Sequence, residues 1–233
     1  MSSREHVLAA LDAVIDPELD EPITSLRFVR SVDITADGDV DVLLRLPTPQ
    51  CAPNFAFLMA ADARAAVRRL PGVRTVTVKL EDHYTGDEIN GALARGDGFT
   101  GAFPGETEDD DLSALRELFQ RKALIARQSK LCEALLGAGA DPEQIVRLCV
   151  ANLEDGPELR RCLALREQLG IAADAAAPAF VSPNGEPLAA GDLQRWLRLA
   201  GLIRTSLEAN GGICRSLLQF RQDLASGPRE VAT

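Results

Sequence analysis

The chain has 233 residues, of which 46% are hydrophobic and 4% aromatic, and its formal net charge is −10 at pH 7. This length gives one or two domains with a sizeable core, and the apolar content excludes a wholly disordered chain. Negative charge and scarce aromatic rings argue against a surface for nucleic acid or anionic membranes. No apolar run approaches the roughly 20 residues of a membrane span. The first residues lack the apolar segment of a signal peptide, so we expect a cytoplasmic protein.

The first part of the chain alternates between helical and strand patterns. Ser2-x-x-Glu5 is a capping box that predicts a first helix, which ends at the loop Asp16-Pro17-Glu18. Strands are expected over 28–34, 40–46 and 76–80, the first two joined by a hairpin turn at Asp37-Gly38. Helices are expected over 55–70 and, after a second capping box at Thr85-x-x-Glu88, up to about residue 95. We therefore predict an α+β domain over 1–96, with a three-stranded sheet and packed helices.

The rest of the chain has a different character. Residues 97–111 are rich in glycine and acidic side chains and are expected to form an exposed linker. Residues 112–233 predict a mainly helical domain with one hairpin at Asn184-Gly185. In it, Asn210-Gly211-Gly212 is expected to separate two helices, the second over 213–224. We expect this domain to dock a partner protein.

One cysteine stands at a distinctive place between the second strand and the following helix. Cys51 lies just before Pro53, which suits the first position of a helix. Unpaired N–H groups and the positive end of the helix dipole favour a thiolate there, which is the form that binds metals and attacks electrophiles. The alternative is a buried cysteine that acts as a small hydrophobic residue.

Two motifs in the first domain make a family resemblance specific. Ile15-Asp16-Pro17-Glu18-Leu19 follows the opening helix, and Thr48-Pro49-Gln50-Cys51-Ala52-Pro53 follows the predicted hairpin. With the strand after Pro71-Gly72, they make residues 5–95 resemble the SufT/PaaD-like family of metal–sulfur cluster assembly proteins. Family members often have glycine before the cysteine, where this chain has Gln50, so the turn is expected to differ in shape. Residues 112–233 lie outside the resemblance.

The resemblance implies a site at Cys51. It points to Cys51 as the residue that holds iron or an iron–sulfur cluster, with Asp16 close by and Thr48 lining the turn. Asp16 has a structural alternative, in which its side chain bonds to backbone N–H groups of its own turn. His83 is a further candidate metal ligand, against the alternative of an exposed loop histidine. Since stable clusters usually need four protein ligands, Cys51 alone would bind iron or a cluster only transiently.

The other four cysteines sit in apolar helical stretches and are expected to be buried in the core; they are Cys132, Cys149, Cys162 and Cys214. The leading functional hypothesis is a non-enzymatic accessory factor that matures a client metalloprotein, with other cluster-assembly proteins or a second copy of the chain as further partners. PaaD-like relatives suggest a multicomponent oxygenase as the client. Two alternatives stay open: an assembly protein without metal binding, and an enzyme with Cys51 as nucleophile.

Overall fold

The computed structural model describes residues 2–225, which form two compact units. Unit 1 comprises the chain up to Ala114 together with the chain from Ala209 onwards, and unit 2 comprises Leu115–Glu208. This division differs from the expected boundaries at residues 96 and 112. The proposed domain limits stay a prediction, which proteolysis can test.

The sheet of unit 1 has the order β3-β4-β5. Strands β3 (Val29–Ile34) and β4 (Asp39–Leu44) pair antiparallel, and β4 pairs parallel with β5 (Thr75–Leu80). The turn between β3 and β4 needs Gly38, because its φ is +86° and a Cβ there would lie 2.4 Å from the carbonyl oxygen of Gly72. The parallel pair requires a crossover, which helix α2 (Pro53–Arg68) provides. The predicted α+β fold with a three-stranded sheet is confirmed.

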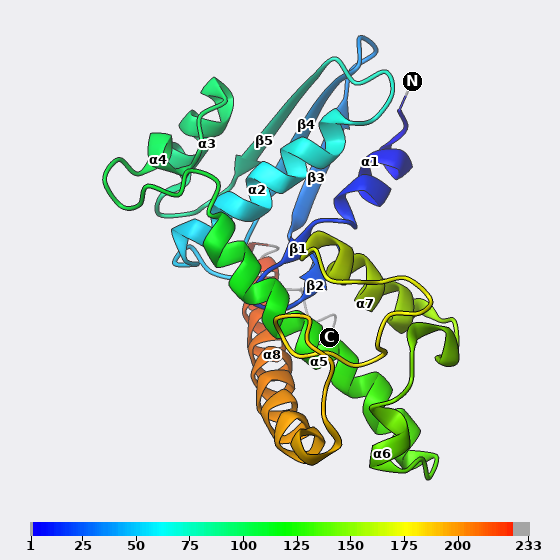
Figure 1. Cartoon of the computed structure of the whole chain (residues 1–233). Coiled ribbons are helices and arrows are strands. Elements are labelled where there is room, and N and C mark those ends of the chain that lie inside the picture. The colour runs from blue at the N-terminus through cyan, green and yellow to red at the C-terminus, as the bar shows by residue number, and fades with distance from the viewer. Residues whose placement is uncertain (1, 226–233) are drawn as a thin grey trace, which may run out of the picture. The chain divides into compact units, whose positions relative to one another are not determined.

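Helices cover this sheet (Figure 1). Besides α2 they are α1 (Arg4–Leu11) and α3 (Gly86–Arg95), and α4 (Phe99–Ala102) packs on α3. Helix α4 lies in the stretch that was expected to be an exposed linker, yet Phe99 and Ala102 are buried. The Phe99 ring packs edge-on against Phe57 of α2, with centroids 5.5 Å apart. The start of the acidic stretch is therefore part of the core of unit 1.

Local details of unit 1 differ from the sequence patterns. The capping box of α1 is formed by Ser3 and His6, whereas the hydroxyl of Ser2 donates to the carbonyl oxygen of Pro71. Thr85 makes no side-chain cap on α3, because its hydroxyl contacts the ring of His83 instead. The loop after α1 contains a short antiparallel pair that was not expected, β1 (Ile15–Asp16) with β2 (Glu21–Pro22).

Unit 2 is mainly helical, as predicted. Its core gathers side chains from several helices and from the segment around Phe180, including Ile125, Cys132, Ile145, Leu193 and Trp196. The helices are α5 (Ser113–Gly137), α6 (Pro142–Ile145), the 3-10 helix η1 (Val150–Asn152), α7 (Pro157–Gln168) and α8 (Ala190–Ala225). Val181 pairs with Pro187 across the expected turn at Gly185, whose φ is +87°.

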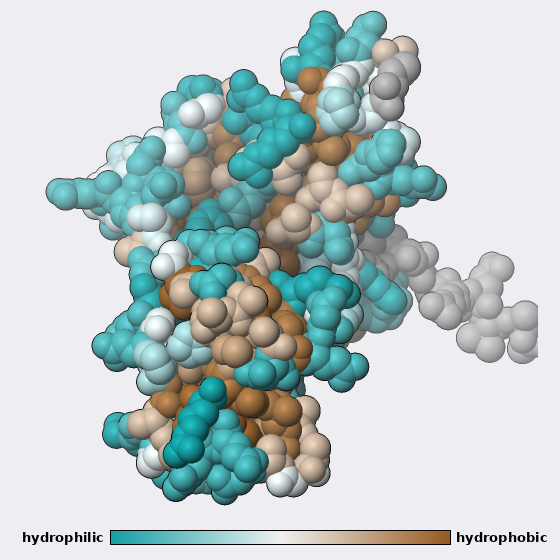
Figure 2. Space-filling view, turned by 45° about the vertical axis from the view of Figure 1, so that its right-hand side comes forward, coloured by the Kyte–Doolittle hydropathy of each residue, from teal (hydrophilic) through white to brown (hydrophobic). Residues whose placement is uncertain are grey.

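Helix α8 does not break where the sequence predicted. It continues through Gly211 and Gly212, so the separate last helix over 213–224 was wrong. Each glycine inside a helix costs about 1 kcal/mol relative to alanine. The residues that follow belong to unit 1 and make ion pairs with other segments of that unit. No helix within residues 2–225 is both long and apolar enough to cross a membrane. Figure 2 shows hydrophilic residues over much of one face, with hydrophobic residues reaching the surface in patches.

Candidate functional site

Cys51 lies in the turn that joins β4 to α2. Ala52 is the N-cap of α2 in an extended conformation, and Pro53 is the first helical residue. The N-cap residue makes no side-chain cap, and the N–H of Phe55 donates instead to Oδ1 of Asn54 at 2.9 Å. The Cys51 side chain is half-buried. The predicted position of a cysteine before a helix N-terminus is confirmed.

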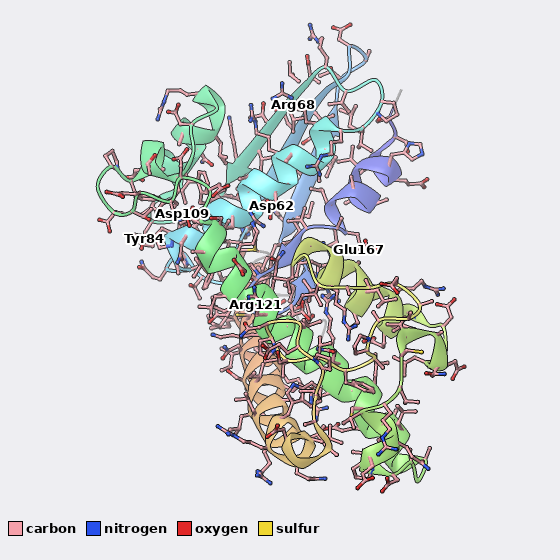
Figure 3. The ribbon with its side chains drawn as sticks, viewed as in Figure 1. Asp62, Arg68, Tyr84, Asp109, Arg121 and Glu167 are labelled. Carbon is pink, nitrogen blue, oxygen red and sulfur yellow. The ribbon has the colours of Figure 1, made fainter. Side chains whose placement is uncertain are left out.

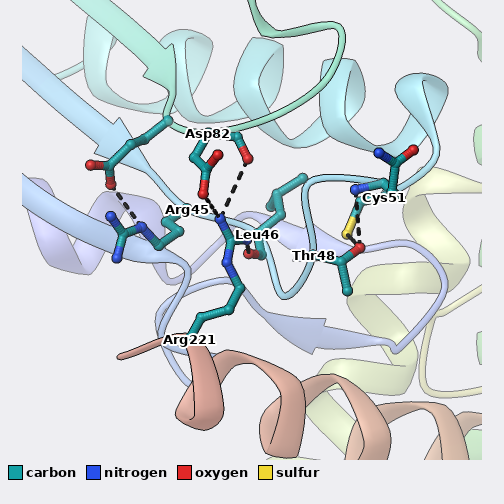
Figure 4. A network of polar contacts seen from close by, with 8 residues as sticks. Arg45, Leu46, Thr48, Cys51, Asp82 and Arg221 are labelled. Carbon is teal, nitrogen blue, oxygen red and sulfur yellow. Dashed lines mark hydrogen bonds and ion pairs between the residues drawn. The ribbon is translucent and has the colours of Figure 1, made fainter. Parts of the chain in front are cut away.

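Thr48 shapes the turn around the thiol (Figure 4). Its hydroxyl oxygen lies 3.6 Å from the Sγ atom of Cys51 and accepts a hydrogen bond of 3.2 Å from the N–H of Gln50. Its carbonyl oxygen accepts the N–H of Cys51 at 3.5 Å. Since the Thr48 hydroxyl already accepts a bond, its own proton is free to be donated to sulfur. The turn thus offers a donor to a thiolate.

His83 and Tyr84, in the loop that follows β5, make hydrogen bonds to the backbone of the turn that contains Cys51. The Nε2 atom of His83 lies 2.9 Å from the carbonyl oxygen of Cys51 and must donate to it, since a carbonyl can only accept. The Nδ1 atom then accepts the N–H of Thr85 at 3.3 Å. The N–H of Tyr84 donates to the carbonyl oxygen of Pro49, and its side chain lies at the surface (Figure 3). Because both ring nitrogens of His83 have protein partners, a metal-binding role for His83 stays a prediction that requires these contacts to open.

Asp16 adopts the structural arrangement that was its alternative. Its Oδ1 atom accepts the N–H groups of Glu18 and Leu19 at 2.8 and 3.0 Å. The side chain is 7% exposed, and burial raises its pKa from 3.8 to about 6 although the two hydrogen bonds oppose the shift. Glu18 and Glu21 raise the pKa further through their negative charge. Asp16 therefore fixes the Asp-Pro turn, and its role toward metal stays a prediction.

The end of helix α8 brings a cysteine that sequence reasoning did not connect with this site. Burial raises the pKa of the Cys214 thiol to about 11, and the charges of Asp16, Cys51 and Glu18 add to the shift. The next residue, Arg215, donates to both carboxylate oxygens of Glu21 at 2.8 and 2.9 Å. Arg221 bonds to the carbonyl oxygen of Leu46 and to the carboxylate of Asp82 (Figure 4). Because the sequence predicted a helix break at Gly211-Gly212, it did not indicate that Cys214, Arg215 and Arg221 belong to one continuous helix.

The remaining cysteines lie in unit 2. The predicted burial is confirmed for Cys132 and Cys162 and is wrong for Cys149, which is half-buried as Cys214 is. Cys149 is not in a helix but caps η1, where its backbone N–H and its thiol both contact the side-chain oxygen of Asn152. Within residues 2–225, no group of three or more His, Cys, Asp or Glu side chains is arranged to hold a metal ion. An iron or cluster cargo at Cys51 would therefore need ligands from elsewhere.

Comparison with known proteins bears on the same region. Residues 4–80 match the family model described as iron-sulfur cluster assembly protein. An uncharacterized protein of Methanocaldococcus jannaschii is 36% identical over 93 residues, which are 40% of this chain and 96% of that protein. The Fe-S protein maturation auxiliary factor of Porphyromonas gingivalis is 32% identical over 34% of this chain and 74% of its own length. An iron-sulfur cluster carrier protein of Synechocystis is 41% identical, but the match covers 34% of this chain and only 22% of the carrier.

Proposed function

Because the chain belongs, through its N-terminal residues 4–80, to the iron–sulfur cluster assembly protein family, we propose that it holds iron or an iron–sulfur cluster transiently on Cys51 and delivers it to a client metalloprotein. Iron–sulfur maturation is the activity that the names of its relatives carry. Those names describe carriers and auxiliary factors rather than catalysts. That Cys51 binds the iron or cluster, and that the protein delivers it to a client, is what we propose here.

The observation that carries the proposal is the built turn around a half-exposed thiol. The turn is held by Thr48 from within and by His83 and Tyr84 from outside. Thiolates are the ligands that iron–sulfur fragments prefer. A hydroxyl proton and the end of a helix both stabilise negative charge on sulfur. The arrangement thus suits a sulfur that binds a soft metal centre from solution.

Weak retention is what delivery requires. A single thiolate leaves most coordination positions of iron open, and thiolates of a client can fill them one after another. As client thiolates bind, the bond to Cys51 is the last one to exchange. The cluster or iron is cargo in this scheme, and the protein supplies an accessible sulfur in a fixed turn.

The client and setting follow from the sequence resemblance and belong to the proposal. We propose a client among multicomponent oxygenases, either an iron–sulfur reductase or a diiron hydroxylase, with other cluster-assembly proteins as donors. Unit 2 would dock the client, and the pair would work in the cytoplasm. The net charge of −10 disfavours nucleic acid as a partner.

Co-production with a client tests the proposal. Cys51→Ser should abolish iron loading of the client while the melting temperature of the variant stays near that of the unaltered chain, because serine keeps the shape of the turn but not the soft sulfur. Cys149→Ser is the matched control, since it removes a half-buried thiol in unit 2. Full iron loading by a stable Cys51→Ser variant would refute metal handling at Cys51.

In that case the second candidate, an assembly protein that binds no metal, would replace it. The lack of a preformed group of three ligands within residues 2–225 is the observation that favours this candidate. The third candidate, a cysteine-nucleophile enzyme, needs a base at the thiol. His83 instead directs its Nε2 atom at the carbonyl oxygen of Cys51, and the thiol itself contacts the hydroxyl of Thr48.

A further inference from the structure

One face of the last part of α8 is turned toward the core of unit 1. Gly211 and Leu218 are buried and Cys214 is half-buried, whereas Ile213 and Phe220 are 58% and 61% exposed. Gly211, Cys214, Leu218 and Arg221 follow one another at steps of three, four and three, which places them on one side of a helix. This side carries one sulfur.

Ion pairs fix this face at both ends of the stretch. At Gly211 an added Cβ would meet a carboxylate oxygen of Glu21 at 3.3 Å, so the backbone comes close to β2 there. Arg215 donates two hydrogen bonds to the carboxylate of Glu21. Further along, Arg221 contacts Leu46 and Asp82, which are in the loops that precede Cys51 and His83. Cys214 thus lies on a helix anchored to both motif loops.

The geometry points to Cys214 as a second thiolate ligand, from helix α8, for the iron or iron–sulfur cargo that Cys51 holds. This inference rests on the proposed function. Cys214 is next to Arg215, whose partner Glu21 pairs with Asp16 across β1 and β2. It shares a helix face with Arg221, whose partner Leu46 precedes the turn of Cys51. Cys214 therefore lies on the part of α8 that spans the two motif loops. The family model matches residues 4–80, so Cys214 lies outside the part of the chain that this model covers.

Two sulfurs change what the site can hold. A pair of thiolates retains a soft cation more firmly than one, yet leaves two positions of a tetrahedral site open. The described residues supply no third ligand in a preformed group, so those positions are left for solvent or for client thiolates. Metal binding replaces the thiol proton of each cysteine, which is released to solvent.

Cobalt(II) alone is a suitable probe, because its sulfur-to-metal absorption reports thiolate ligands. The full chain and three variants would be titrated with Co²⁺ in the presence of a phosphine reductant and without oxygen: Cys214→Ser, Cys51→Ser and the control Cys149→Ser. We expect Cys214→Ser to show about half of the sulfur-to-metal absorption per bound Co²⁺ and at least about tenfold weaker binding. Bound Co²⁺ should also protect Cys51 and Cys214, but not Cys149, from alkylation.

The outcomes separate the two claims. If Cys51→Ser loses the absorption while Cys214→Ser keeps the intensity and affinity of the unaltered chain, the second ligand is refuted and Cys51 stands alone. If Cys51→Ser also binds as the unaltered chain does, metal handling at Cys51 fails, and the inference fails with it. Thermal melting of each variant shows whether a loss of binding reflects unfolding. A double variant Arg215→Ala/Arg221→Ala, which keeps both thiols, should weaken Co²⁺ binding because the helix is no longer anchored.

Discussion

The Nε2–H group of His83 donates a hydrogen bond of 2.9 Å to the carbonyl oxygen of Cys51. This bond joins the loop after β5 to the turn before α2, and the opposite ring nitrogen accepts from the N–H of Thr85. The ring therefore donates through Nε2 and presents Nδ1 to the N–H of Thr85. In this arrangement His83 positions the cysteine without touching its sulfur.

Replacing His83 by alanine should lower the free energy of unfolding by about 1–2 kcal/mol, because a partly buried carbonyl loses its donor. Co²⁺ binding should weaken modestly, with the sulfur-to-metal absorption per bound ion unchanged. His83→Gln, which can donate a similar bond, should restore part of both. Urea unfolding and Co²⁺ titration measure the two effects. A change in the cobalt spectrum without a loss of stability would show instead that the imidazole is a ligand.

The pH dependence of stability should reveal Asp16. Its pKa is about 6 in the folded chain against 3.8 for an unperturbed carboxyl, so between these values the folded chain holds a proton that the unfolded chain has lost. A shift of about two pKa units gives about 3 kcal/mol over the full titration, so stability should fall by about 2 kcal/mol as pH rises from 4 to 7. Asp16→Asn keeps an oxygen for the two N–H groups and should remove this slope.

Urea unfolding followed by circular dichroism at several pH values between 4.5 and 7.5 measures the slope. Glu106→Gln is the control, because it removes an exposed carboxylate from a loop and should leave the slope as it is. An Asp16→Asn variant with the same pH dependence as the unaltered chain would show that the buried carboxyl is ionised at pH 6 and above.

Limited proteolysis should cut the acidic stretch at its exposed residues 104–106 and spare α4. Phe99 and Ala102 are buried in unit 1, whereas Gly105 has a φ of +86° and a Cβ added there would meet no atom within 4 Å. Mass spectrometry of the first fragments locates the cut. Early cleavage within 99–102 would mean that α4 is not docked, as the linker predicted for 97–111 required. Early cleavage inside α2 would contradict the fold of unit 1.

Elements with a strong local pattern could be predicted from the sequence. Apolar residues recur every second position in β3 and β4 and at helical spacing in α2, because one face of each element is buried in the core. The spacing alone therefore predicts the burial of Val42 and Leu58. The turn cysteine could be placed for the same reason, since Pro53 marks the start of α2 whatever the remainder of the chain does.

The missing parts depend on contacts between distant segments. Gly211 and Gly212 favour a break locally, but the ion pair of Arg215 with Glu21 lies far along the chain and favours continued helix. For that reason, the sequence did not indicate that Cys214 lies on a helix face turned toward the loops of the site. The cap predicted at Thr85 is missing for a local reason, because its hydroxyl lies 3.2 Å from Nδ1 of His83, two residues earlier in the chain.

Arg166 gives a test of unit 2 that is independent of the site. Its side chain is 1% exposed. Its guanidinium donates to the carbonyl oxygens of Pro178 and Ala179 at 2.8 and 2.5 Å, and to the side-chain oxygen of Gln128 at 2.6 Å. Gln128 in turn accepts the N–H of Val181. The arginine thus joins α5 and α7 to the segment before the Asn184-Gly185 turn.

Arg166→Met should therefore destabilise unit 2 by about 2 kcal/mol or more, because methionine fills much of the space but leaves the carbonyl oxygens of Pro178 and Ala179 without their donor, at about 1–3 kcal/mol each. Arg160→Met on the same helix is the matched control. Its ion pair with Asp155 is exposed, with 63% and 75% of the two side chains accessible, and such pairs contribute at most about 1 kcal/mol. Trp196, the single tryptophan of the chain, is 6% exposed in the core of unit 2, so its fluorescence during urea unfolding reports this unit. Equal unfolding midpoints for the two variants would show that the buried guanidinium is not what holds these segments together.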